Sequence, residues 1–228
     1  MCTSIVSNIS GTIVGFNLDL LGMEHRVTVT DKNVFIEIND ESNGWIPLFG
    51  ADGKGNFVAM PTCWPYDNRS VRRDGATDII SLGIDLLLRK KSFDEVKKFV
   101  CDNDICCMDG VTFMSQISDK NGDALQIIPG QGYAYKRRPK FSVLTNFSPF
   151  KGMSEIHPWM GKDRYDKAVE RLTNAEVFGV KECLETLKEC SQTVCPTVVS
   201  IVFDAGNSEV FWCENREYEN IRSQKISE

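Results

Sequence analysis

Short runs of alternating or continuous apolar residues, separated by turn residues, cover most of the chain and predict a protein rich in β-strands. The first run covers residues 3–6, breaks at a turn over 8–11 and resumes over 12–19, which predicts a hairpin that begins at Cys2 and ends at Asp19. Similar patterns predict further strands at 26–30, 33–38, 45–50, 56–60, 111–118, 124–128, 133–135, 141–146, 197–204 and 208–213.

Four other segments have the composition and spacing of helices. The apolar run within 75–91 predicts a buried helix, and Ser92, three residues before Glu95, forms a capping box that predicts a second helix. Amphipathic segments predict helices over 161–172 and 180–190. Two successive helices after a run of strands indicate a helical layer that covers a sheet, so the expected fold class is α+β.

The composition is that of one ordinary globular domain over residues 1–228, with 42% hydrophobic and 25% charged residues. No segment approaches the roughly 20 apolar residues of a membrane span, and no signal-like segment precedes Cys2, so we expect a cytoplasmic protein without membrane association. The net charge is −6 and the basic residues are dispersed, which argues against nucleic acid as a partner.

The cysteines indicate reduced thiols. The count of nine is odd and contains no paired Cys-x-x-Cys spacing, which fits a reducing compartment better than a disulfide framework. Only two histidines, His25 and His157, are present to complete a zinc site. We therefore expect most cysteines to be small core residues, and we expect no metal and no cofactor.

Cys2 has a chemistry of its own because it follows the initiator methionine. Methionine aminopeptidase removes Met1 when the next side chain is small, and removal would place a thiol and a free α-amine on one residue. A cysteine has a pKa of about 8.5 and an α-amine of about 7.7–8.0, so the amine is suited to take the thiol proton. The predicted hairpin returns Asp19 to Cys2, and a buried acid there would orient the amine.

The opening Met-Cys-Thr and the segment Gly15–Asp19 resemble the choloylglycine hydrolase family of N-terminal nucleophile amidases, which includes bile salt hydrolases and penicillin V acylases. Four of the five positions in Gly-Phe-Asn-Leu-Asp agree with the family's Gly-Arg-Asn-x-Asp, and the family arginine is Phe16 here. Arg26, a few residues further on, is an alternative source of the missing positive charge. The resemblance implies a four-layer αββα fold with antiparallel sheets.

The same resemblance extends to later residues. The Leu-Thr-Asn segment that ends at Asn146 is similar to the one whose asparagine side chain donates into the family's oxyanion hole, and Arg164 matches an arginine that supports the catalytic centre. A backbone N–H near Thr62, before Trp64, is the match for a second oxyanion donor. Gln126 stands where relatives carry glutamate. The residues alone also allow Asn146 to be a turn residue, Arg164 a surface helix residue and Thr62 a loop residue.

The resemblance implies hydrolysis of a linear amide through an acyl-enzyme thioester on Cys2. The expected substrate is a small molecule with an apolar acyl part, such as a bile salt, penicillin V or an N-acyl amino acid, held by aromatic residues such as Trp45, Phe57 and Trp64. A homo-oligomer is expected. Three alternatives stay open: an acyltransferase, a non-catalytic binding protein, because Phe16 replaces arginine, and a class II glutamine amidotransferase, which would begin Cys-Gly-Ile.

Overall fold

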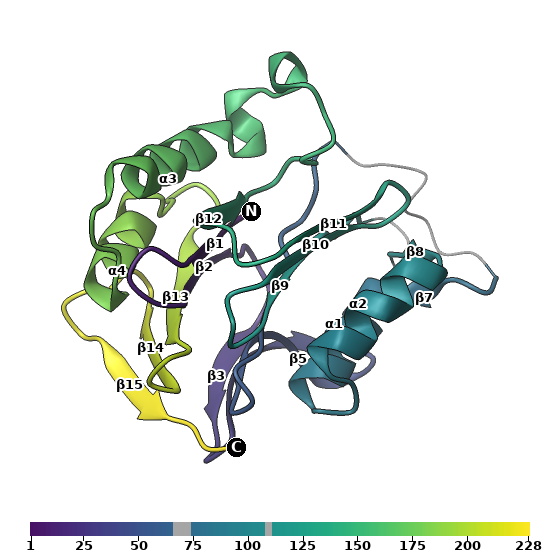
Figure 1. Ribbon diagram of the computed structural model, residues 1–228, viewed down its shortest axis with the longest axis horizontal. Coiled ribbons are helices and arrows are strands. Elements are labelled where there is room, and N and C mark those ends of the chain that lie inside the picture. Colours follow the sequence, from purple (N-terminus) through teal and green to yellow (C-terminus); the bar gives the residue numbers. More distant parts are fainter. Residues whose placement is uncertain (66–73, 108–110) are drawn as a thin grey trace.

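Two antiparallel sheets form the centre of the molecule (Figure 1), and the computed structural model describes residues 1–65, 74–107 and 111–228. The first sheet has six strands in the order β12-β1-β2-β13-β14-β15, and the second has seven in the order β11-β10-β9-β6-β5-β4-β3. The first sheet consists of β1 (Cys2–Ser7), β2 (Ile13–Asp19), β12 (Phe141–Leu144), β13 (Thr197–Asp204), β14 (Glu209–Glu214) and β15 (Arg222–Lys225). The second consists of β3 (His25–Val29), β4 (Asn33–Asp40), β5 (Gly44–Asp52), β6 (Phe57–Ala59), β9 (Ser115–Ser118), β10 (Ala124–Ile128) and β11 (Gly132–Lys136).

The N-terminal hairpin occupies the interior of the first sheet. Strand β1 pairs with β2 on one side, where Cys2 lies opposite Leu18, and with β12 on the other, where Ser4 lies opposite Leu144. The predicted return of Asp19 to the start of the chain is confirmed, because the Asp19 N–H donates to the Met1 carbonyl at 2.9 Å. The first residues of the chain are therefore held on both sides.

Alternate residues of β2 face the second sheet and the helices, as the period of a strand requires. The ring centroids of Phe16 and Phe49, on β5, lie 5.1 Å apart and join the two sheets. Gly15 faces the opposite way, where a Cβ would lie 2.4 Å from the Cys183 sulfur, so the close approach of this helix requires glycine.

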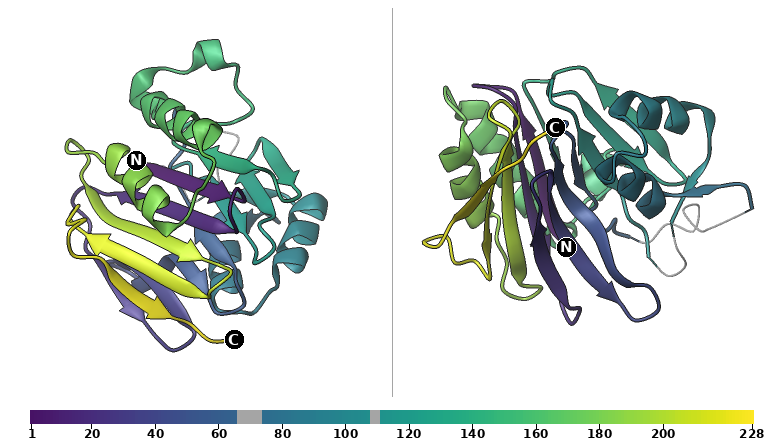
Figure 2. Two further views of the ribbon diagram at one scale, coloured as in Figure 1. Left: turned by 60° about the vertical axis from the view of Figure 1, so that its left-hand side comes forward. Right: turned by 90° about the horizontal axis from the view of Figure 1, so that it is seen from below.

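Helices cover both sheets (Figure 2). Helices α3 (Lys162–Asn174) and α4 (Val180–Glu189) pack on the first sheet, while α1 (Ile79–Leu87) packs on β5 and β6, and α2 (Phe93–Asp102) packs on α1 and β11. The capping box of Ser92 and Glu95 begins α2, as predicted. The α+β class with antiparallel sheets is confirmed, and the four-layer description stays the interpretation that fits these contacts.

Several boundaries differ from the sequence prediction. The segment predicted as one helix over 75–91 begins with the short strand β7 (Thr77–Asp78), which pairs in parallel with β8 (Ile105–Cys106). The Asp78 side chain accepts a hydrogen bond from the N–H of Ile80 and caps the helix. Helix α1 therefore begins at Ile79, four residues later than position 75. The strand predicted at 111–118 is β9 alone, and β15 was missed because its Arg-Ser-Gln-Lys sequence is polar.

The nine cysteines are all free thiols, and Cys101 is the exposed one among them. Within the described ranges no helix has the length and apolar character needed to cross a membrane. The same ranges contain no group of three or more His, Cys, Asp or Glu side chains placed to hold a metal ion.

Candidate active site

Cys2 lies at the start of β1 and is buried, with 4% of its surface exposed. Its backbone N–H donates to Oδ1 of Asn146 at 2.7 Å. The Met1 ammonium donates to the Asp19 carbonyl at 2.9 Å and lies 3.7 Å from the Cys195 sulfur. While Met1 is attached, its backbone therefore fills the space next to Cys2.

Asn146 follows β12 and joins three of the predicted site residues. Its Oδ1 accepts from the Cys2 N–H and from Nη2 of Arg164 at 2.9 Å. Because both neighbours of Oδ1 are donors, the orientation of the amide is fixed. Nδ2 then points the other way and donates to the Thr62 carbonyl at 2.7 Å and to its hydroxyl at 3.1 Å.

Arg164 is on the first turn of α3 but points inward, with 2% of the residue exposed. Nη1 donates to the Cys2 carbonyl and, at 3.1 Å, to the Thr3 hydroxyl. The same nitrogen lies 3.6 Å from the Asp19 carboxylate. The surface-helix interpretation is thus wrong for this arginine, which cross-links the N-terminal strand to Asp19 and Asn146.

The Asp19 carboxylate is held by residues outside the N-terminal hairpin. Oδ1 accepts from the Thr197 hydroxyl at 2.6 Å, and Oδ2 accepts from the Gln192 amide. Burial raises the pKa of Asp19 to about 6, although the Thr197 hydrogen bond and the Arg164 charge act in the opposite direction. The carboxylate is thus buried among hydrogen-bond donors.

The Cys2 thiol is not activated while Met1 is in place. Burial raises its pKa to about 11, and the favourable effects of the N-terminal ammonium, the Asp19 N–H and Arg164 do not overcome this. A thiol with this pKa is almost entirely protonated near neutral pH, so it needs a base beside it to act as a nucleophile.

Thr62 presents its backbone to the same centre. It lies opposite Phe113 in an isolated antiparallel bridge. The hydrogen bonds of this bridge are made by the residues on either side of Thr62 and Phe113, not by these two residues themselves. In such a pair, the N–H and C=O of Thr62 both point away from Phe113. The carbonyl meets Asn146, so the N–H faces the Asn146 side as well.

The aromatic residues expected at an acyl pocket lie in different places. Trp64 is near the site, since its backbone N–H donates to the Asn146 backbone carbonyl at 2.6 Å. Its ring is exposed, and the ring centroid lies 6.5 Å from that of Trp159. The Arg26 guanidinium lies instead over the ring of Trp45, with its carbon atom 4.3 Å from the ring centroid. Phe57 is fully buried and its ring stacks near that of Phe203.

The position of the family arginine is filled by apolar packing. Phe16 is 0% exposed and contacts Phe49 between the sheets. Arg26 does not replace the missing charge, because its Nε donates to Glu37 at 2.6 Å at the edge of the second sheet. Gln126 is buried in a hydrogen-bonded group with Gln116 and Ser142.

Sequence analysis missed three residues that support the site. Thr197 and Gln192 bind the Asp19 carboxylate, and Thr3 binds Arg164. Thr3 and Thr197 each place a hydroxyl at the start of a largely apolar strand, which is a usable signal for a buried polar contact. Gln192 gives no such signal, because its segment has no regular pattern.

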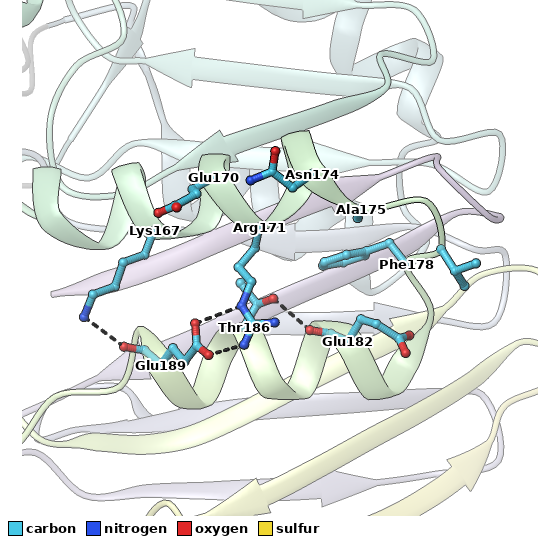
Figure 3. A pocket seen from close by; sticks show the side chains of 10 residues that line it. Lys167, Glu170, Arg171, Asn174, Ala175, Phe178, Glu182, Thr186 and Glu189 are labelled. Carbon is cyan, nitrogen blue, oxygen red and sulfur yellow. Dashed lines mark hydrogen bonds and ion pairs between the residues drawn. The ribbon is translucent and has the colours of Figure 1, made fainter.

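A groove between α3 and α4 lies apart from the predicted site residues. The cavity there has a volume of about 450 Å³. Figure 3 shows side chains of its lining, among them Lys167, Arg171, Phe178 and Glu189. Arg171 binds Glu189 through two hydrogen bonds, and the Lys167 ammonium donates to the Glu189 carbonyl. None of the predicted site residues lines this cavity.

The arrangement of the sheets and helices is the fold of the N-terminal nucleophile hydrolases. The structure superposes on the conjugated bile acid hydrolase from Clostridium perfringens, described for a cysteine-to-alanine mutant, with a TM-score of 0.69 and 13% identity over 99% of this chain and 92% of that chain. An arginine-to-leucine variant of the same enzyme gives a TM-score of 0.66, also at 13% identity, over 99% and 92% of the two chains.

Two further solved structures extend the likeness. Penicillin V acylase from Agrobacterium tumefaciens matches with a TM-score of 0.59 and 13% identity over 94% of this chain and 83% of that chain. The N-acylethanolamine-hydrolyzing acid amidase ortholog from Caenorhabditis elegans matches with a TM-score of 0.55 and 18% identity over 90% and 93%. No protein-family model and no curated protein matches the sequence. The α+β fold with antiparallel sheets is thus confirmed, at identities that establish the fold alone, and the four-layer arrangement stays a prediction.

Proposed function

We propose that this protein hydrolyses a linear amide with Cys2 as an N-terminal nucleophile. The observation that carries the proposal is the convergence of Asn146 and Arg164 on the backbone of Cys2, with Asp19 beside the guanidinium. These four residues come from β1, β2, the segment after β12 and α3, so a purely local structural role does not account for their meeting. The solved structures of similar fold are named as a conjugated bile acid hydrolase, a penicillin V acylase and an acid amidase, which supports the same reaction class.

In the proposed reaction, loss of Met1 frees the α-amine of Cys2. The amine takes the thiol proton, and the sulfur attacks the amide carbonyl carbon to form a tetrahedral intermediate. The proton passes to the leaving nitrogen, the C–N bond breaks, and the amine product departs. Water then attacks the thioester, giving the carboxylic acid and restoring the thiol.

The positions of Asn146 and Thr62 support an oxyanion hole at their meeting point. Nδ2 of Asn146 already lies 2.7 Å from the Thr62 carbonyl, and the Thr62 N–H faces the same side. Both hydrogens of Nδ2 are bound to Thr62 in the chain with Met1, so we propose that one of them turns from Thr62 to the substrate oxygen. Loss of such a donor typically lowers turnover by about 10²–10³. Arg164 keeps the Asn146 amide turned in this direction.

The exposed rings of Trp64 and Trp159 support binding of an apolar acyl group next to the site. Both rings are large exposed apolar surfaces. Trp64 is held next to the site because its backbone N–H donates a hydrogen bond to the Asn146 backbone carbonyl. Pairs of exposed aromatic rings are typical of binding surfaces. The substrate class proposed is therefore a small amide with an apolar acyl part.

The first test is the state of the N-terminus. Intact-mass measurement of protein made in cells is expected to show loss of Met1, and alkylation by iodoacetamide at neutral pH is expected to modify Cys2 faster than the exposed Cys101. Protein made with methionine aminopeptidase inhibited is expected to keep Cys2 unreactive, because the thiol is buried and its pKa is about 11. Retention of Met1 in cells would refute the mechanism.

The second test is turnover. Met1-free protein is incubated with penicillin V, glycine- and taurine-conjugated bile salts and N-acyl amino acids, and release of the acid is measured. Cys2→Ala is expected to abolish turnover, whereas the matched variant Cys101→Ala, at an exposed thiol, keeps it. Addition of an acceptor amine distinguishes an acyltransferase, which would form a new amide in place of the acid.

A non-catalytic binding protein on the same fold is the second candidate. It is favoured by Phe16, which fills the position of the family arginine with an uncharged, fully buried ring. The two are separated by the turnover assay together with a binding measurement on Cys2→Ala. Saturable binding of an amide without turnover by the Met1-free protein would select the binding protein.

A further inference from the structure

Met1 continues the register of β1 by one residue and pairs with Asp19 through its backbone. The Asp19 N–H donates to the Met1 carbonyl at 2.9 Å, and the Met1 ammonium donates to the Asp19 carbonyl, also at 2.9 Å. Two residues that exchange both of these bonds form the hydrogen-bonded pair of an antiparallel sheet. The next pair in the register is Cys2 opposite Leu18. The methionine is therefore held as one strand residue beside the nucleophile.

The segment before β13 closes one side of the place that Met1 occupies. The Cys195 sulfur lies 3.7 Å from the Met1 nitrogen. The Leu20 N–H donates to the Pro196 carbonyl at 3.0 Å, which holds this segment against the end of β2. Met1 and Cys195 are both half-buried, so the place opens toward solvent. We call it the Met1 position, and it is bounded by the Asp19 backbone and the Cys195 sulfur.

The Met1 position lies next to the Cys2 thiol. Burial raises the pKa of this thiol to about 11, and the Met1 ammonium and the Asp19 N–H are among the groups that act against the rise. A charge or a hydrogen bond shifts a pKa in this way only from nearby. A molecule in the Met1 position would therefore lie beside the nucleophile.

Removal of Met1 would leave two backbone groups of Asp19 to be paired. Its N–H and its carbonyl both point toward the Met1 position, and backbone groups are costly to leave without a partner. Ligands that supply such partners to the backbone of a strand gain affinity from main-chain hydrogen bonds. The matching ligand has a nitrogen donor and an oxygen acceptor separated as they are within one residue.

We propose that the Met1 position binds the amine part of the amide substrate, and that this part is an L-α-amino acid. The inference rests on the proposed function, in which Met1 is absent. The substrate N–H donates to the Asp19 carbonyl, as the Met1 nitrogen does, and the substrate carboxylate accepts from the Asp19 N–H, as the Met1 carbonyl does. An L-α-amino acid carries both groups on one carbon with the configuration of Met1. A taurine conjugate carries its acid one carbon further away, and an ethanolamide has no acid.

Binding to Met1-free Cys2→Ala separates this inference from the chemistry, since alanine at position 2 also permits removal of Met1. The probes share one hexanoyl group and differ in the amine part: N-hexanoyl-L-alanine, its D-enantiomer, N-hexanoyltaurine and N-hexanoylethanolamine. Ligand-observed NMR titration is expected to show that the L-alanine conjugate binds about tenfold more tightly than the other three. Equal binding of all four, or binding of none, would overturn the inference. Absence of amide turnover by the Met1-free parent protein, with this preference kept, would overturn the proposed function instead.

Variants in the same Cys2→Ala background locate the ligand. Cys195→Phe fills the Met1 position and is expected to weaken binding of the L-alanine conjugate about tenfold, whereas Cys195→Ser keeps the size and should bind within about twofold of the parent. The matched control is Val194→Phe, at a neighbouring residue that is 86% exposed, which is expected to bind like the parent. Equal weakening in Cys195→Phe and Val194→Phe would refute this location.

Protein that keeps Met1 provides a test that does not depend on the folding of Cys195→Phe. It is made with methionine aminopeptidase inhibited, and Met1 then occupies both Asp19 backbone groups. We expect it not to bind the L-alanine conjugate. Binding of this conjugate with the same affinity as in the Met1-free protein would overturn the inference.

Discussion

Nη2 of Arg164 donates to Oδ1 of Asn146 over 2.9 Å, and both residues are buried. The same oxygen accepts from the Cys2 N–H, so the arginine and the N-terminal strand hold the asparagine amide from two directions. The consequence is that the Asn146 amide nitrogen has one available direction, toward Thr62. In the proposed mechanism, the amide becomes an oxyanion donor when one of its hydrogens leaves Thr62 for the substrate oxygen.

Arg164→Met is expected to destabilise the protein by about 3–5 kcal/mol, because it leaves the buried Asp19 carboxylate without its positive neighbour. Arg171→Met, also on α3, is the matched control. It breaks an exposed ion pair with Glu189 and is expected to cost less than about 1 kcal/mol. Urea unfolding followed by circular dichroism measures both variants. Similar losses in the two would show that Arg164 is not buried in an ion pair in solution.

Gly161, between the short helix η3 (Pro158–Met160) and α3, is expected to tolerate no side chain. Its φ is +87°, and a Cβ would lie 2.5 Å from Nη2 of Arg164. Gly22→Ala, at φ +75° with open space around the Cβ, carries the backbone strain alone and is expected to cost about 1–2 kcal/mol. Gly161→Ala is expected to cost clearly more and to lower turnover in the proposed assay. Equal costs would mean that Arg164 moves freely aside.

Asp19 is expected to make stability depend on pH in a defined direction. Its pKa is about 6 in the folded protein that keeps Met1, against an ordinary value of 3.8, so folding favours the protonated carboxyl. This contribution is fully present below about pH 4 and is lost as the pH rises through about 6, with a total on the order of 2–3 kcal/mol. Relative to Asp19→Asn, the parent protein should therefore lose stability over this range.

The control for this measurement is Asp163→Asn, at an exposed acid of α3. Its stability is expected to follow that of the parent protein at every pH. Thermal unfolding of Met1-bearing protein, made with methionine aminopeptidase inhibited, gives the comparison. If the stability of the parent protein rises relative to that of Asp19→Asn as the pH increases, the raised pKa of Asp19 is contradicted.

Phe16→Arg is not expected to restore the arginine of the similar family. Phe16 is 0% exposed and its ring contacts Phe49, so a guanidinium there enters an apolar interface between the sheets. The expected cost is about 3–5 kcal/mol, whereas Phe16→Leu keeps an apolar side chain and should cost less than about 2 kcal/mol. Chemical unfolding of the two variants is the measurement. A stable and more active Phe16→Arg protein would show that the site still accommodates the charge.

The strands and the N-terminal hairpin were predictable from sequence because their apolar residues alternate and their turns are marked by Asn and Gly. The elements that were missed lack such signals. Strand β15 is polar along its whole length and is defined by pairing with β14, a long-range contact that no local pattern encodes. Strand β7 has two residues, and its neighbour β8 lies beyond two helices in the chain.

The positions of the candidate site residues were given by resemblance, but their contacts were not. Asn146 was expected to face the substrate, and in the chain with Met1 it instead binds the Cys2 N–H, Arg164 and Thr62. Trp45 and Phe57 are aromatic residues of the kind expected in a pocket. Trp45 instead lies under Arg26, and Phe57 lies in the core. An aromatic residue has the same sequence signal in a core and in a pocket, so only the tertiary structure distinguishes them.

The pairing of β1 sets an order of events in time. Its neighbours are β2, which itself pairs with β13 near the end of the chain, and β12, which is made more than halfway through synthesis. The N-terminal residues therefore stay outside any completed sheet until most of the chain has left the ribosome. In the proposed mechanism, this interval is when we expect an aminopeptidase to remove Met1. Once the sheet closes, the Met1 ammonium is bound to the Asp19 carbonyl, so the proposed mechanism requires removal of Met1 before folding is complete.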